Sequence, residues 1–280
     1  MNLNFYSEFD NTYGKMQAGN FYWNINSTNL INDYYGYGIT ARPFEVVDFY
    51  EPRTEFQTRY VKIPKSLGTW FFYSSNYNKK FALDINPSGT IFNEKNRISY
   101  GIFISPRYRF NDRFSLIYSF NYAKLNNNTG YIDTDTDGTI VFARRNRATF
   151  TNTIQGKYSI NNKMNINLNI RHYWSYADNH DILTLQNDGT FTPNITYTNN
   201  MDSNLNRWNL DLNYSWWFAP GSQVTVLYRN YSSIFTRDFS HQFGDNFRDA
   251  LDYQNLYHSI SISVRYFIDY NTLKTSKRSK

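Results

Sequence analysis

The feature that most constrains this chain is a strict alternation of apolar and polar residues over long stretches. Along 164–176 the even positions are apolar or aromatic, apart from His172, while asparagine, arginine and serine fill most of the odd ones. The same alternation recurs over 114–122, 208–218 and 260–268. Successive side chains of a β-strand point to opposite faces of the sheet, so each set occupies one face. No stretch of comparable length has the spacing of an amphipathic helix. The pattern therefore predicts an all-β protein.

The expected strands are long. Several alternating runs extend over about 10 to 14 residues, whereas strands of globular proteins usually run about 5 to 6. A tilted strand that crosses a bilayer needs about 9 to 11 residues. We expect about thirteen antiparallel strands, near residues 2–10, 16–25, 33–40, 44–51, 67–75, 81–87, 97–110, 114–123, 146–160, 164–177, 205–218, 222–232 and 253–268.

The connections between these strands are of two kinds. Tight turns rich in Asn, Asp, Pro and Gly are expected at 111–113, 161–163 and 219–222. Long polar excursions are expected at 124–145, 178–204 and 233–252. Outer-membrane barrels are built in this way, with short turns on the periplasmic side and longer loops outside. The sequence thus predicts an antiparallel up-and-down transmembrane β-barrel over 1–268, followed by a basic tail at 269–280.

The number of expected strands is odd, whereas bacterial single-chain barrels have even numbers. The first residues, Met1 to Phe5, also lack the basic and apolar regions of a signal peptide. These two points predict that the barrel is truncated before Met1. The alternative is one miscounted strand within 1–66, the least regular region.

Alternation alone does not distinguish a membrane barrel from a soluble β-sandwich, because either fold has one apolar face. Aromatic residues crowd the strand ends, as Tyr108, Phe110 and Phe114 do, and this favours an interfacial girdle. The polar parity carries Asn, Ser and long cations, which suit a hydrated interior. The residues expected to line the lumen are Arg107, Arg109, Arg147, Lys157, Arg171, Asp211, Arg229 and Arg265. Their cations either favour anions in an open lumen or pair with Asp211, Asp84 or Glu94 and plug it.

Three segments resemble a family of Gram-negative outer-membrane proteins in which a family-nine-type carbohydrate-binding domain precedes a C-terminal β-barrel domain of unknown function. They lie at 59–64 (RYVKIP), 140–146 (IVFARRN) and 216–222 (WWFAPGS). In the third segment, Trp217, Phe218 and Ala219 stand where the family has Glu, Tyr and Arg. The resemblance extends over roughly 55 to 268 and implies the bacterial outer membrane as the location. The lipid bilayer, lipopolysaccharide and a glycan ligand are then the expected partners.

An acidic loop is the most specific local motif. Asp133, Asp135 and Asp137 are followed by Gly138 and, two residues later, by Ile140, as in the first half of a calcium loop. Position 12, which normally supplies a bidentate glutamate, is Arg144. The motif predicts either a weak calcium site or a polar loop whose Asp and Thr residues favour turns.

The function expected from the sequence is an outer-membrane barrel module that anchors a glycan-related domain or passes its ligand. Tyr197 and Tyr231 are candidates for stacking on sugars. One alternative is an outer-membrane hydrolase that uses His172, His180 and Asp181, and another is a soluble β-sandwich adhesin. Although the net charge is +6, the cations follow the strand period instead of clustering, so a nucleic-acid partner is not expected.

Overall fold

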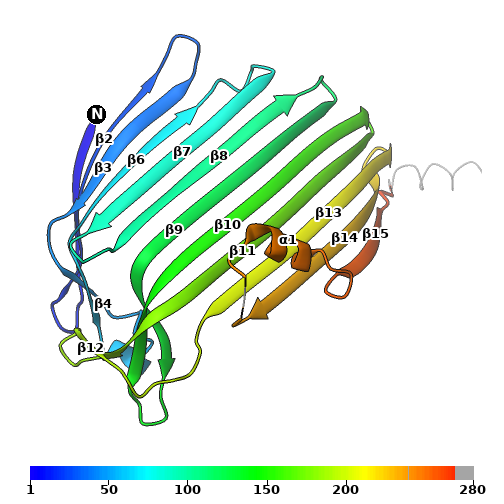
Figure 1. Cartoon of the computed structure of the whole chain (residues 1–280). Helices are drawn as coiled ribbons and strands as arrows, with labels where there is room; N and C mark the ends of the chain where they lie inside the picture. The colour runs from blue at the N-terminus through cyan, green and yellow to red at the C-terminus, as the bar shows by residue number, and fades with distance from the viewer. Residues whose placement is uncertain (239, 269–280) are drawn as a thin grey trace, which may run out of the picture.

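The computed structural model describes residues 1–238 and 240–268. The basic tail expected at 269–280 lies outside the described residues. Figure 1 shows one large twisted sheet in which strands neighbouring in sequence lie side by side. In order across the sheet, its strands are β1 (Asn2–Phe9), β2 (Met16–Thr28), β3 (Tyr34–Arg42), β6 (Ser66–Ser74), β7 (Phe81–Phe92), β8 (Ile98–Arg109), β9 (Phe114–Thr134), β10 (Ile140–Asn161), β11 (Met164–Leu185), β13 (Ser203–Ala219), β14 (Ser222–Thr236) and β15 (Tyr257–Arg265).

Smaller elements lie at one end of the sheet. Strand β12 (Phe191–Pro193) pairs with β11, and β4 (Val46–Asp48) pairs with β5 (Val61–Ile63) in a separate two-stranded sheet. A 3-10 turn, η1 (Glu55–Gln57), precedes β5. In the chain, the helix α1 (Phe243–Ala250) follows β14 and precedes β15. No helix in the described part of the chain is long and apolar enough to cross a membrane.

The prediction of an all-β antiparallel sheet is confirmed, since each strand pair of the large sheet is antiparallel. The expected number of about thirteen strands is also confirmed: in the described residues the large sheet has thirteen, of which twelve form the path from β1 to β15 and β12 pairs with β11 beside it. The expected strand at 44–51 is only the short β4, outside this path. Strands β1 and β15 lie at opposite edges and do not pair, so the sheet is not closed.

The two ends of the sheet differ in their connections, as expected. Tight turns join β10 to β11 and β13 to β14, while long connections join β3 to β6, β11 to β13 and β14 to β15. The expected loop at 124–145 is mostly wrong, because β9 and β10 continue their pairing to Thr134 and Ile140. Polar side chains do not prevent this, because the ladder is formed by backbone groups. The expected loop at 178–204 likewise begins with the last part of β11.

The long-loop end has its own hydrophobic core, which we call the end cluster. It consists of Val61, Ile140, Phe142, Leu183 and Leu185. The Arg59 guanidinium donates to the Leu185 carbonyl at 3.0 Å, and Tyr131 N donates to the Glu51 carboxylate at 3.0 Å. The connection between β3 and β6 is therefore fixed to strands much further along the sheet. Two of the segments that carry the family resemblance, 59–64 and 140–146, meet in this cluster.

The helix α1 packs on the sheet across β11 and β13 (Figure 1). The Phe243 ring lies 5.5 Å from the His172 ring, and the Phe247 ring lies 5.1 Å from His172 and 6.0 Å from Trp208. The sequence pattern missed this helix within the excursion expected at 233–252, because two turns are too short to show a helical period.

Candidate functional site

The predicted lumen-lining residues share one face of the sheet, which we call the polar face. Directly paired residues lie on the same face, and so do alternate residues of one strand. Arg109 pairs with Ser115, Ser115 with Lys157, and the row continues through Asn167, Asn213, Leu227 and Ser261. Arg107, Arg147, Arg171, Asp211, Arg229 and Arg265 are each an even number of residues from a member of this row.

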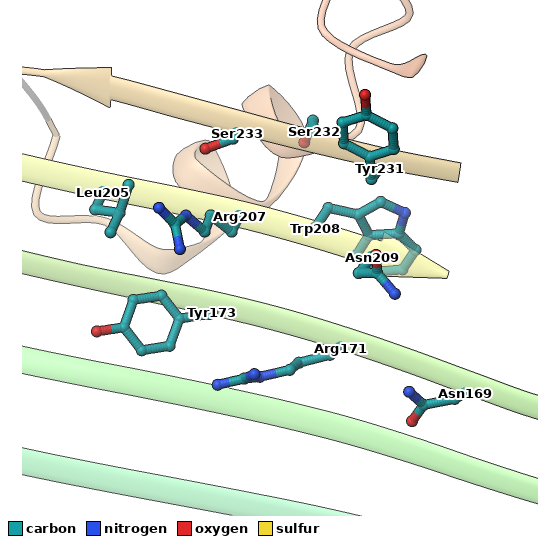
Figure 2. A pocket seen from close by; sticks show the side chains of 10 residues that line it. All are labelled: Asn169, Arg171, Tyr173, Leu205, Arg207, Trp208, Asn209, Tyr231, Ser232 and Ser233. Atoms are coloured by element: carbon teal, nitrogen blue, oxygen red, sulfur yellow. The ribbon is translucent and has the colours of Figure 1, made fainter. Parts of the chain in front are cut away.

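A recess of about 610 Å³ opens on the polar face between β11, β13 and β14 (Figure 2). Its polar-face residues include Asn169, Arg171 and Tyr173 from β11, Arg207 and Asn209 from β13, and Tyr231 from β14. Tyr173 pairs directly with Arg207, and Arg171 with Asn209, so the two arginines are diagonal neighbours on adjacent strands. We call this site the Arg171–Arg207 recess.

Neither arginine of the recess has a carboxylate within ion-pair distance among residues 1–238 and 240–268. The Arg171 guanidinium lies 5.7 Å from the centroid of the Tyr173 ring. The next row toward the tight turns is different, because Arg229 donates two hydrogen bonds to Asp211, at 2.7 and 3.0 Å. The polar face thus carries one neutralised arginine beside two that are open to an anion.

The other predicted cations have mixed surroundings. The Arg107 guanidinium lies 4.3 Å from the centroid of the Tyr77 ring, and Arg109 donates to the Tyr77 carbonyl at 3.3 Å. Arg147, Lys157 and Arg265 are exposed. Of the carboxylates considered as partners, only Asp211 pairs with a predicted lumen cation in the described part of the chain. Glu94 instead binds Arg97 and Arg144, and Asp84 accepts from Ser74 and Tyr77.

A comparison with protein families shows the family to which the chain belongs. The model of DUF5916, a domain of unknown function, matches residues 1–277. The chain belongs to this family. A comparison with curated proteins found no similar sequence. The match confirms the part of the resemblance that concerns a domain of unknown function, and it extends further toward the N-terminus than the three segments do. The outer-membrane location and the carbohydrate-binding partner domain remain predictions for this DUF5916 chain.

The acidic loop of the DUF5916 chain does not bring its carboxylates together. Asp135 accepts from Thr136 N at 2.7 Å and Asp137 from Thr139 N at 2.8 Å, as in side-chain turns. Hydrogen bonds from Thr139 hold the pKa of Asp137 below its usual value. Asp133 accepts from Thr134 N at 2.8 Å and also from the Tyr197 hydroxyl at 2.7 Å. In the described residues, no group of three or more His, Asp or Glu side chains could hold a metal ion, so the loop supports the turn interpretation over the calcium site.

Tyr197 and Tyr231, the candidates for sugar stacking, have different environments. Tyr197 is buried, and burial together with Asp133 raises its pKa. Its ring is therefore not available to a ligand. Tyr231 is 41% exposed on β14, within the recess. Its ring is stacked on Tyr257 of β15 with the centroids 5.3 Å apart.

Of the residues of the hydrolase hypothesis, His180 and Asp181 lie together and His172 lies apart from them. His172 is buried beneath α1, where its Nε2 lies 2.9 Å from Asn206 Oδ1. His180 lies further along β11, in the extension toward the end cluster, where its Nε2 is 3.1 Å from Asn127 Oδ1 and 3.9 Å from Asp181. One histidine thus packs beneath the helix, and the other lies beside the exposed carboxylate of the next residue on the same strand.

Sequence reasoning missed Arg207 and Tyr173 as members of the site. The signal was present, because both residues occupy the polar parity of their strands. What was absent was the register that sets Tyr173 opposite Arg207. A single sequence assigns faces but not which residues of two strands become neighbours.

Proposed function

We propose that this chain is an outer-membrane β-barrel module whose polar face lines a hydrated lumen and which anchors or passes a glycan-related ligand. The observation that carries the proposal is the apolar face of the sheet. That face consists of a largely aliphatic band between two rows of aromatic residues.

The two rows are evenly separated along neighbouring strands. Phe114, Tyr158 and Trp216 stand at the tight-turn end, and Tyr122, Phe150 and Trp208 stand eight residues away on the same strands. Eight strand residues extend over about 26 Å. The lipid-facing surface of an outer-membrane barrel is an apolar band about 25 Å tall, with an aromatic girdle at each interface. With strands tilted by about 35–45°, this length corresponds to a height of about 20 Å, so the two aromatic rows lie near the two edges of such a band.

The aliphatic band is also uncovered. Leu212 is 40% exposed and Ile262 69% exposed. A β-sandwich would bury these side chains against a second sheet. In the described part of the chain, the only other sheet is the two-stranded β4–β5 pair. An apolar surface of this extent is stable when lipid covers it, and this favours the barrel over the soluble adhesin.

Closure of the sheet is part of the proposal. With twelve strands in the described path, β1 and β15 run antiparallel to each other and are able to pair across a closing seam. Closure satisfies the edge backbone groups, which lipid cannot do. It also places the polar face, with its asparagine, serine and arginine side chains, around the interior.

The test uses the absence of cysteine from the chain. Single cysteines are introduced as Leu212→Cys and Asn213→Cys, adjacent residues of β13 that point to opposite faces, and are labelled with an environment-sensitive fluorophore. Each full-length variant is refolded into vesicles that contain brominated phosphatidylcholine. We expect strong quenching of the label at 212 by the brominated lipid, and quenching of the label at 213 by aqueous iodide only. Equal response of the two labels, or failure of the chain to enter vesicles, would overturn the proposal.

A further inference from the structure

We propose that the Arg171–Arg207 recess binds an acidic saccharide, that is, a sugar ring that carries a carboxylate. This inference rests on the proposed function, because the recess faces a lumen only if the polar face is the inner one. The groups proposed to bind the saccharide are the guanidiniums of Arg171 and Arg207 and the tyrosine and amide side chains around them.

Within residues 1–238 and 240–268, no carboxylate neutralises the positive charge of the recess. Arg171 and Arg207 are diagonal neighbours on β11 and β13, and the Cβ atoms of such pairs are about 7 to 8 Å apart. Long side chains at this separation reach one anion from two sides. A planar guanidinium binds a carboxylate through two parallel hydrogen bonds. The Arg229–Asp211 pair in the adjacent row shows this geometry within the same sheet.

The remaining walls suit a hydroxylated ring more than a bare ion. Tyr173 lies between the two arginines, and Tyr231 is held in place by its stacking on Tyr257. Tyrosine combines a flat apolar ring with a polar hydroxyl, so it contacts both the C–H face and the hydroxyl groups of a sugar. Asn169 and Asn209 add amide donors and acceptors. The volume, about 610 Å³, lies within the range of small-molecule sites.

Charge and shape together select the ligand class. A neutral sugar would leave two guanidiniums without a counter-charge, whereas inorganic phosphate would use the guanidiniums and leave the rings and amides without contacts. A uronic acid contacts the guanidiniums through its carboxylate and the tyrosine rings and amides through its hydroxylated ring. Lys157, two rows from Arg171 on the same face, is exposed and does not line the recess, so it offers a control for the loss of a positive charge elsewhere on this face.

The experiment is calorimetric titration of the refolded full-length chain with digalacturonate, digalactose and inorganic phosphate. We expect digalacturonate to bind at least tenfold more tightly than digalactose and phosphate, and more weakly in 0.5 M salt. Arg171→Gln combined with Arg207→Gln should weaken digalacturonate at least tenfold, while Lys157→Gln should change it less than twofold. Tyr173→Leu should weaken digalacturonate and leave phosphate unchanged.

Three results would overturn the inference. They are phosphate binding as tight as that of digalacturonate, equal binding of digalactose and digalacturonate, and digalacturonate binding that the double arginine variant does not reduce. The labels at 212 and 213 separate the two proposals. If they report opposite environments while digalacturonate does not bind, the recess inference fails and the proposed function stands. If the labels respond equally, the proposed function itself fails.

Discussion

The apolar face of the sheet has two regions that differ in what covers them and in which side chains they carry. Between the aromatic rows the face is mostly aliphatic, as at Leu168, Leu210 and Leu212, although Tyr118 and Asn230 also lie there. Toward the long-loop end, the same face carries His172, Asn204, Asn206 and Ser232, and all four are buried. The first region is bare, whereas the second lies beneath α1.

The helix provides the polar partners that lipid would not. Asn204 donates to Asn246 Oδ1 at 3.0 Å, Asn206 donates to the Asn246 carbonyl, and Ser232 donates to the Ala250 carbonyl at 2.7 Å. A buried polar group without a partner costs about 1 to 3 kcal/mol. The polar residues beneath α1 thus have partners in the helix, whereas the bare region carries mainly apolar side chains. Four substitutions test this comparison.

The largest effect is expected from a charge in the bare region. Leu212→Arg places a cation midway between the aromatic rows, and an arginine at the lipid-facing midplane of a barrel costs about 2 to 4 kcal/mol. The free energy of unfolding from vesicles, measured by denaturant titration, should fall by this amount. Asn213→Arg, on the polar face of the same strand, should change it little, and an equal loss in both variants would contradict the assignment of faces.

The next effect is expected beneath the helix. Asn246 accepts from Asn204 and donates to the carbonyls of Ser240 and Gln242, at 2.7 and 2.9 Å. Asn246→Ala removes these bonds and leaves the buried Asn204 amide nitrogen without its acceptor, which should cost about 1 to 3 kcal/mol. Cleavage of the 237–256 segment by limited proteolysis should become faster. Unchanged cleavage would show that the helix does not depend on these bonds.

A smaller loss is expected from Ser232→Ala. The Ser232 hydroxyl is buried and donates a hydrogen bond to the carbonyl of Ala250, the last residue of α1. Its removal should lower the free energy of unfolding by about 1 kcal/mol. Ser233→Ala is the matched control, because Ser233 points to the opposite face. A similar loss in the control would mean that the effect comes from the strand and not from the helix contact.

The smallest effect is expected on the outer side of α1. Arg248 is 81% exposed, and its nearest carboxylate, Asp245, is 3.9 Å away. Exposed pairs of this kind contribute little to stability. Arg248→Ala should therefore leave both the unfolding transition and the proteolysis rate of 237–256 unchanged. A clear destabilisation would place the stabilising contacts of the helix on its exposed side and would weaken the comparison.

Much of the fold could be predicted because the strand period is local. The parity of Met164 to Tyr176 assigned these side chains to their faces without knowledge of any neighbour, and the tight turns followed from residues such as Asn162 and Gly221. The candidate site could be predicted only in part. Arg171 and Tyr231 were identified as single residues, but their proximity to Arg207 depends on the register of three strands.

The sequence by itself determined the strands, their two faces and the separation of short turns from long loops, since each of these depends on residues a few positions apart. The tertiary structure decided the rest. It placed Val61 against Phe142 and Leu183 in the end cluster, and α1 over His172. Among the described residues, it also placed a carboxylate beside Arg229 and none beside Arg171 or Arg207. These outcomes depend on contacts between residues far apart in the chain, which form only when the register and the packing of the whole sheet are fixed.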